Sequence, residues 1–247
     1  MKSSEAVLAE LVPPPGTVDG VCTTCQTWND TPDDHECSNC RDIREILGAP
    51  PIPISVMTLY KKPSPLRDWL TYYKGCPEET VEPNPVYADL VVDLVADFFQ
   101  AQGDRLQTAT GGFDAVTVVP STERPPPHAM ELVLANVLGP HQVKPLLARG
   151  TGHLGFRIPS VDGYVVSETK PLPHRVLLLD DVYTTGARIN SAVFALRLSG
   201  VEIAGALVLA RRVNPDFNPA AASLWQRQSA LPYDFTASPY IQATSHD

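Results

Sequence analysis

The sequence predicts an α/β fold, with helices on both sides of a parallel sheet and a small four-cysteine module in front of it. Two apolar runs, residues 115–119 and 176–179, have the pattern of strands buried on both faces. A third apolar strand is expected over residues 202–210. Segments with helical periodicity separate these strands, and such alternation predicts a single parallel sheet.

Length and charge limit the possible classes of protein. The chain has 247 residues and 43% hydrophobic residues, enough for one substantial core and a small appendage. Its formal net charge is −9, and residues 1–50 carry nine Asp or Glu against three Lys or Arg. This acidity disfavours direct binding to DNA or to anionic lipid. No apolar run is long enough for a bilayer and no secretion signal is evident, so we expect a cytoplasmic protein.

The N-terminal part predicts a leader and a metal module. Residues 1–18 end in three prolines and a glycine, and we expect them to form a mobile leader. Residues 19–50 contain two Cys-x-x-Cys pairs that are eleven residues apart. The four cysteines are Cys22, Cys25, Cys37 and Cys40. Each pair can direct two sulfurs to one tetrahedral metal ion, which predicts a small zinc ribbon with structural Zn²⁺.

Two alternatives to this zinc site stay open. Disulfides could join the cysteines, although a cytoplasmic location disfavours them. His35 could compete as a ligand, but its position is more typical of a loop residue. The fifth cysteine, Cys76, lies outside the pattern and is interpreted as an ordinary thiol.

The main domain is expected over residues 51–212, with a C-terminal extension over residues 213–247 that has little periodicity. Asn84 and Pro85 form a suitable N-cap and first residue for one of its helices. The helices expected before residue 140 cover residues 66–74, 86–100 and a segment that ends at Leu138. Additional strands are expected over residues 54–60 and 142–147, with a hairpin arm over residues 161–166.

The segment after the strand at 176–179 carries the most specific signal. Asp180 and Asp181 follow the strand, and Thr184-Thr185-Gly186 then opens a helix. Backbone N–H groups, two hydroxyls and the positive end of a helix dipole form a cradle for a monophosphate. The two carboxylates can accept hydrogen bonds from vicinal hydroxyls, as on a ribose. An ordinary turn with solvated acids is the simpler alternative. A nucleotide hydrolase with a magnesium-binding Asp is excluded, because it needs a G-x-x-x-x-G-K-[ST] loop and the sequence contains none.

The sequence Leu-Leu-Leu-Asp-Asp-Val-Tyr-Thr-Thr-Gly at this point resembles the 5-phosphoribosyl-1-pyrophosphate (PRPP) motif of type I phosphoribosyltransferases. The resemblance implies that Asp180 and Asp181 are the catalytic residues and hold the ribose hydroxyls. It implies binding of the 5-phosphate by the residues that follow, where the family usually has Thr or Ser in place of Arg188. These phosphate-binding residues are Val182, Tyr183, Thr184, Thr185, Gly186, Ala187 and Arg188.

A second resemblance extends over residues 20–212. The cysteine pairs, the Tyr-Lys and Tyr-Lys-Gly segments and the phosphoribosyl motif together are similar to the ComF family. Members of that family couple a zinc ribbon to a type I phosphoribosyltransferase-like domain. Lys61 and Lys74 stand where the family has basic residues, which implies a ligand role for Lys74. Two surface lysines remain the alternative.

The same resemblance assigns two more loops. The loop after the strand at 115–119 would contact pyrophosphate through Ser121, Thr122 and Arg124. The family usually continues with Arg-Gly-Phe-Asn-Gln, whereas this chain has Pro125-Pro126-Pro127-His128. Residues 148–160 match a flexible segment that closes over phosphates, with Arg157 in the place of a recurrent arginine. An irregular surface connection is the alternative for this segment.

The function implied by resemblance is binding of PRPP, or of a nucleoside monophosphate, with Mg²⁺. The protein would transfer phosphoribose to an unidentified nitrogen acceptor and release pyrophosphate. The competing hypothesis is a non-catalytic PRPP or nucleotide sensor, or an accessory protein of DNA uptake, in which the ribbon docks a protein partner. An amidophosphoribosyltransferase with its own glutaminase is excluded because no cysteine follows Met1.

Overall fold

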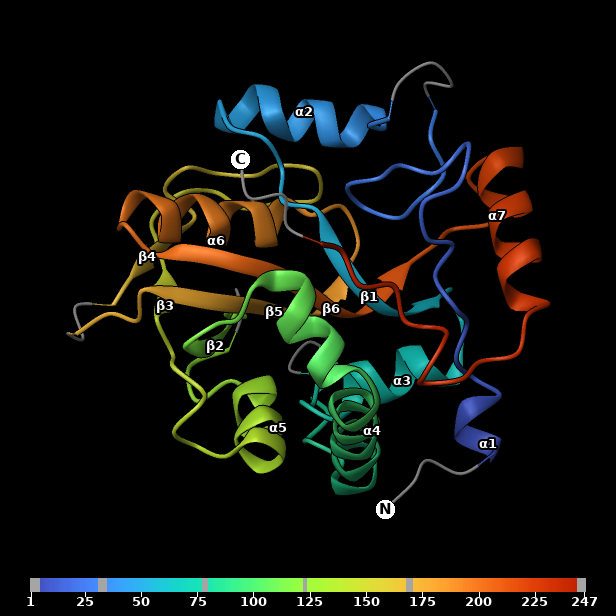
Figure 1. The fold of residues 1–247 in the computed structure, drawn as a ribbon, viewed down its shortest axis with the longest axis horizontal. Coiled ribbons are helices and arrows are strands. Elements are labelled where there is room, and N and C mark those ends of the chain that lie inside the picture. Colours follow the sequence, from blue (N-terminus) through green and yellow to red (C-terminus); the bar gives the residue numbers. More distant parts are fainter. Residues whose placement is uncertain (1–4, 31–34, 77–79, 122–123, 168–170, 244–247) are drawn as a thin grey trace.

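The computed structural model describes residues 5–30, 35–76, 80–121, 124–167 and 171–243. A parallel sheet with the strand order β1-β6-β5-β2 forms its centre (Figure 1). These four strands are β1 (Ile54–Tyr60), β2 (Ala115–Val118), β5 (Arg175–Tyr183) and β6 (Glu202–Arg212). A separate antiparallel pair consists of β3 (Leu147–Arg149) and β4 (Tyr164–Val166). The predicted α/β class with a parallel sheet is confirmed.

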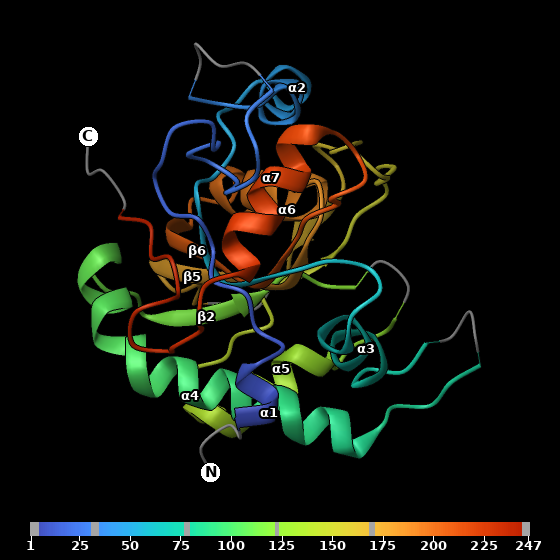
Figure 2. The same cartoon turned by 90° about the vertical axis from the view of Figure 1, so that its right-hand side faces the viewer.

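Helices cover both faces of the sheet, as the two views show (Figures 1 and 2). The helices are α1 (Glu5–Leu8), α2 (Ser38–Leu47), α3 (Pro65–Tyr72), α4 (Pro85–Thr110), α5 (Ala129–Leu138), α6 (Ala187–Leu198) and α7 (Pro219–Ser229). Side chains alternate along β5, so Leu178 faces the layer that contains α6, and Leu177 faces the layer that contains α4. Both leucines are fully buried, and the sheet therefore has an apolar core on each side.

Two predicted elements differ from the structure. The helix predicted over residues 86–100 continues to Thr110, because Leu106 extends its buried face and only Gly111, at φ +66°, ends it. The strand predicted over residues 142–147 is wrong for most of its length. Val143 forms a single parallel bridge to Val116, and the next strand, β3, begins at Leu147 and pairs with β4. The hairpin arm predicted over residues 161–166 is present as β4.

The N-terminal leader and the C-terminal extension both cover the outer edge of β1. The backbone N–H of Leu59 donates to the carbonyl of Val12 at 2.7 Å. Val56 exchanges backbone hydrogen bonds of 2.8 and 2.9 Å with Tyr240. Most of the predicted leader is described, and its residues Val7 and Leu11 are buried against the α4 side of the core. These contacts protect a strand edge that would otherwise expose unpaired N–H and C=O groups.

No helix in the described ranges is both long and apolar enough to cross a membrane.

Candidate functional site

The site is organised around two carboxylates at the carboxyl end of β5. Asp180 and Asp181 are only 3% and 5% exposed. The apolar residues of β5 cannot compensate two buried charges, so the partners must come from other segments. The segment after α3 supplies partners: Tyr73 donates from its hydroxyl to Asp181 Oδ2 at 2.9 Å, and Lys74 forms an ion pair with the same oxygen. The backbone N–H of Asp181 donates to Asp180 Oδ1 at 3.0 Å. A segment distant in sequence therefore completes the end of the strand.

Arg188, in the first turn of α6, faces the other carboxylate. Its Nη2 atom lies 3.5 Å from Asp180 Oδ1 and 3.4 Å from the carbonyl oxygen of Pro120. The Tyr164 hydroxyl donates to the same carbonyl at 3.1 Å. Within the described residues, the buried Nε atom of Arg188 has no hydrogen-bond partner. Arg188 thus connects Asp180 to the loop after β2.

These surroundings separate the pKa values of the two carboxyl groups. Burial raises the pKa of Asp180 to about 7, against the opposing effect of Arg188. Burial would also raise the pKa of Asp181, but the charge of Lys74, the charge of Arg188 and the hydrogen bonds from Lys74 and Tyr73 lower it to about 2. Asp181 is therefore ionised at neutral pH, whereas Asp180 can exchange a proton near neutrality.

Two cavities meet at these carboxylates. The first has a volume of about 650 Å³ and lies between α4, α5 and the loop after β2. The second, of about 470 Å³, lies over the loop that joins β5 to α6. Residues common to both cavities are Thr71, Lys74, Asp180, Asp181 and Arg188. A ligand that spans both cavities would pass directly over the two carboxylates.

Basic residues outnumber acidic ones in the described lining of the two cavities, and the excess lies in the second cavity. The lining lysines and arginines are Lys62, Arg67, Lys74, Arg124 and Arg188. The acidic residues of the lining are Asp89, Asp180 and Asp181. This excess of positive charge stands on a chain whose net charge is −9, and it favours an anionic ligand.

Residues 182–188, which comprise the end of β5, the turn at 184–186 and the start of α6, have the geometry of an anion cradle. Gly186 has φ +85°, and a Cβ atom there would lie 2.1 Å from the Tyr183 hydroxyl, so only glycine fits. In the part of the chain that the structure describes, the backbone N–H groups of Thr185 and Gly186 have no hydrogen-bond acceptor. Both residues line the second cavity, directly before the N-terminus of α6. Val182, Thr184 and Ala187 line it as well.

Of the other predicted site residues, some line the cavities and others lie away from them. Ser121 and Arg124 line the first cavity, and Arg124 donates to the carbonyl of Gly75 at 2.6 Å. Thr122 lies outside the described residues. The side chain of Arg157 is exposed, and its backbone N–H reaches the Thr185 hydroxyl at 3.4 Å. Lys61 lies away from both cavities, with its ammonium group 5.6 Å from the Trp225 ring centre.

Several residues of the site were missed by sequence reasoning. Tyr73 precedes Lys74 in the Tyr-Lys-Gly segment, so its place beside a candidate ligand residue was a usable signal. Three other residues have no such signal, because their partners lie far away in the sequence. Tyr164 donates to the carbonyl of Pro120, Asn39 to that of Thr185 and Arg211 to that of Thr184. His128, just before α5, lines the first cavity and accompanies the change from the family pattern.

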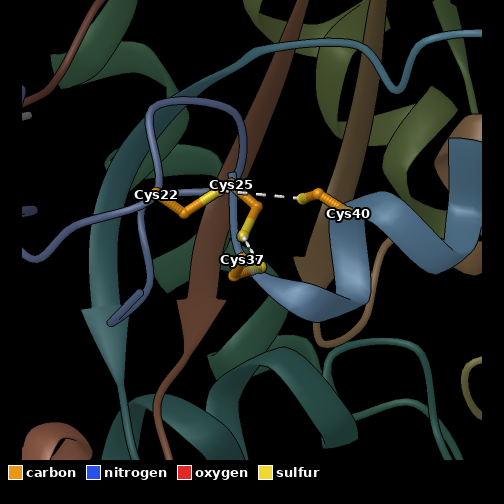
Figure 3. A group of neighbouring side chains, drawn as sticks. All are labelled: Cys22, Cys25, Cys37 and Cys40. Carbon is orange, nitrogen blue, oxygen red and sulfur yellow. Dashed lines mark hydrogen bonds between the residues drawn. The ribbon is translucent and has the colours of Figure 1, made fainter. Parts of the chain in front are cut away.

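The four cysteines form a separate centre. Cys22 and Cys25 come from a loop, and Cys37 and Cys40 from the start of α2, as Figure 3 shows. Their ligand atoms lie within 4.8 Å of one another and are buried. The sulfurs of Cys22 and Cys40 are 3.8 Å apart, and those of Cys25 and Cys37 are 3.7 Å apart.

These distances fit a tetrahedral zinc ion. Four sulfurs at about 2.3 Å from one Zn²⁺ would be about 3.8 Å apart. No pair is joined as a disulfide, and the exposed His35 is not part of the group. All four cysteines belong to the same apolar cluster as Ile54 and Val208 of the sheet. The cysteine module (residues 19–50) therefore packs on the main domain.

We expect the purified protein to contain about one zinc ion per chain, because all four sulfurs converge on one point. Replacing Cys25 by serine should remove most of the metal and lower the thermal midpoint of unfolding. Cys76→Ser is the matched control, since Cys76 is also buried but lies outside the cluster. Elemental analysis of the three proteins measures the difference. Equal zinc content in wild type and Cys25→Ser would contradict the assignment.

The pKa of Asp180 predicts a pH-dependent stability. A carboxyl group with a folded pKa of about 7 and an unfolded pKa of about 3.9 binds its proton more tightly in the folded state. The free energy of unfolding should therefore fall as pH rises from about 4 to about 7, by at most about 1.4 kcal/mol per pH unit. Asp180→Asn should flatten this part of the curve.

Urea denaturation between pH 4 and 8 tests this prediction, with Asp104→Asn on exposed α4 surface as the control. Asp181 acts in the opposite direction: its lowered pKa stabilises the fold above pH 4, and this contribution is lost as pH falls toward 2. A wild-type curve that has the same slope as Asp180→Asn between pH 4 and 7 would contradict the assignment.

Comparison with known proteins adds one distant structural likeness. No protein family and no curated protein matches the sequence. Among solved structures, the chain is similar to the orotate phosphoribosyltransferase from Aeropyrum pernix, with 22% sequence identity and a TM-score of 0.34. The match covers 59% of this chain and 68% of the other.

Proposed function

We propose that this protein binds PRPP and transfers its phosphoribosyl group to a nitrogen acceptor, with release of pyrophosphate. The observation that carries the proposal is the meeting of two cavities at Asp180 and Asp181, the second of them with an excess of basic residues, beside a loop with two free N–H donors among the described residues. PRPP has an anionic group at each end of a ribose and would span such a site. The resemblance of residues 177–186 to the PRPP motif of type I phosphoribosyltransferases supports the same ligand.

Each part of the ligand has a matching set of groups. The 5-phosphate would lie on the loop, against the N–H groups of Thr185 and Gly186 and the start of α6. The ribose hydroxyls would donate to Asp180 and Asp181. The pyrophosphate would extend into the first cavity, toward Ser121 and Arg124. A nucleoside monophosphate would occupy the second cavity alone.

Magnesium fits this arrangement through the ligand. Mg²⁺ prefers carboxylate, phosphate and hydroxyl oxygens in an octahedral shell, and it would neutralise charge on the leaving pyrophosphate. Asp180 and Asp181 offer carboxylate oxygens on the same side as the proposed phosphates. Their existing partners, Arg188 and Lys74, leave the ligand itself as the main source of metal oxygens.

The protein groups would act by position and charge. Transfer breaks the bond from the anomeric carbon to pyrophosphate and forms a bond to the acceptor nitrogen. Positive charge develops on the ribose ring, and the ionised carboxylate of Asp181 would stabilise it. Lys74 and Arg124 would hold the leaving oxygens. The connection from β3 to β4 reaches the loop through Arg157 and Thr185, so it could limit the access of water.

The contact of Arg188 favours a second candidate, a non-catalytic sensor of PRPP or of a nucleotide. Its guanidinium engages Asp180, one of the two carboxylates that catalysis would need. A sensor requires only ligand-dependent binding, and the cysteine module would then dock a protein partner. The DNA-uptake hypothesis would be one case of this second candidate.

Binding at the loop is tested with Thr185→Ala. Thr185 lines the second cavity, and a hydrogen bond from its hydroxyl to a charged phosphate would contribute roughly 1.5–3 kcal/mol. We therefore expect PRPP affinity, measured by calorimetry with magnesium, to fall by about tenfold or more. Thr71→Ala is the control, because Thr71 lines both cavities but donates its hydroxyl to Arg67 O of its own helix. Equal losses in the two variants, or none in either, would contradict phosphate binding at this loop.

Asp181→Asn separates the enzyme from the sensor. In a transferase the carboxylate matters most when the ribose carries positive charge, so turnover should fall more than PRPP affinity. Pyrophosphate release from PRPP is assayed with a panel of bases, amines and ammonia. A wild-type protein that binds PRPP but releases no pyrophosphate above background would replace the enzyme by the sensor.

A further inference from the structure

Two successive carbonyl groups in the turn between β5 and α6 accept hydrogen bonds from side chains that lie on the same side of the turn as the cysteine module. Asn39 donates from Nδ2 to the carbonyl of Thr185 at 2.7 Å. Arg211, at the end of β6, donates from Nη1 to the carbonyl of Thr184 at 2.8 Å. Asn39 lies in the first turn of α2, immediately before Cys40. One of the two contacts therefore comes directly from the cysteine module.

Arg211 joins the loop to the other half of the cysteine cluster. It is 4% exposed, and its Nε atom donates to the carbonyl of Cys25 at 2.8 Å. Its Nη2 atom lies 3.9 Å from the sulfur of Cys25, and its guanidinium lies 4.7 Å from the Tyr183 ring centre. Arg211 also donates to the carbonyls of Tyr183 and Arg212, so it connects Cys25 to the end of the sheet as well as to the loop.

The held carbonyls set the direction of the donors. In a planar trans peptide the C=O and the following N–H point in opposite directions. Asn39 and Arg211 hold the Thr184 and Thr185 carbonyls on the outer side of the loop, so the N–H groups of Thr185 and Gly186 point to the opposite side. That side is the second cavity, which both residues line.

The loop depends on these contacts because it has cavities on both sides. An outer cavity of about 300 Å³ is lined by Thr184 and Thr185 together with Asn39 and Arg211. The second cavity lies on the inner side. Within the described residues, the Thr184 carbonyl is held by Arg211 and the Thr185 carbonyl by Asn39, whereas the Gly186 carbonyl is held by Asn190 of α6.

We propose that Asn39 and Arg211 are positioning residues that make phosphate binding at the loop depend on metal in the cysteine cluster. Metal joins the two Cys-x-x-Cys pairs, and so fixes Cys25 and the first turn of α2 relative to each other. Both side chains then hold the loop with its donors toward the ligand. The inference rests on the proposed function for the identity of the ligand, and on the described contacts for the coupling.

The first test uses Asn39→Ala in zinc-loaded protein. We expect its zinc content to equal that of wild type, and its affinity for PRPP and for inorganic phosphate to fall roughly fivefold or more. Asn214→Ala is the control, since Asn214 lines the same outer cavity and is exposed. Amide hydrogen exchange over residues 182–192, measured without ligand, should become faster in Asn39→Ala only. Unchanged exchange and unchanged affinity in Asn39→Ala would overturn the proposal.

The second test measures the coupling itself. PRPP affinity is compared in zinc-loaded and chelator-treated protein, for wild type and for Asn39→Ala, with circular dichroism to check that each form is folded. We expect metal removal to weaken binding in wild type, zinc addition to restore it, and the effect to be smaller in Asn39→Ala. An equal metal effect in both proteins would overturn the role of Asn39. If wild type binds neither PRPP nor phosphate, the proposed function fails, whereas ligand-free amide exchange over residues 182–192, compared in zinc-loaded and chelator-treated wild type, still decides the coupling. Chelation that unfolds the whole protein would overturn the proposed local coupling through Asn39.

Discussion

The burial of two adjacent carboxylates at the end of β5 is the constraint on which the site depends. A charge at that depth is stable only with a partner, and Asp181 obtains Lys74 and Tyr73 whereas Asp180 obtains Arg188. These partners bring the segment after α3 and the start of α6 to the same place. The two cavities between these elements meet at the strand end, and they share the cations that pair with its carboxylates, Lys74 and Arg188.

The cysteine module is a part of the same construction. Its sulfurs lie in the apolar layer that covers one face of the sheet, and its side chains reach the loop from behind. A metal ion in the cluster would add to the order that this small acidic segment gains from the sheet. Arg211 links the cysteine cluster to the loop between β5 and α6, because it donates to the carbonyls of both Cys25 and Thr184.

Local sequence patterns were sufficient for the parts of the fold that depend on them. The buried runs that became β2 and β5, the two Cys-x-x-Cys pairs and the loop after Asp181 were all recognisable within short windows. The end of α4 was missed because the buried positions that continue the helix to Thr110, such as Leu106, were not recognised in the sequence. Tyr164 and Arg211 were missed because their roles arise only when distant segments meet. Such contacts have no signature in a single sequence.

The position of β1 in the sheet also governs how the chain can fold. β1 pairs only with β6 among the named strands, and Glu202 at the start of β6 follows long after Tyr60. During synthesis, β1 must wait without a strand partner until nearly all of the main domain has left the ribosome. Sheet closure is therefore a late, non-local step, and it should be slow compared with helix formation. In the interval, side chains of β1 that are all buried in the folded protein have no sheet to pack against.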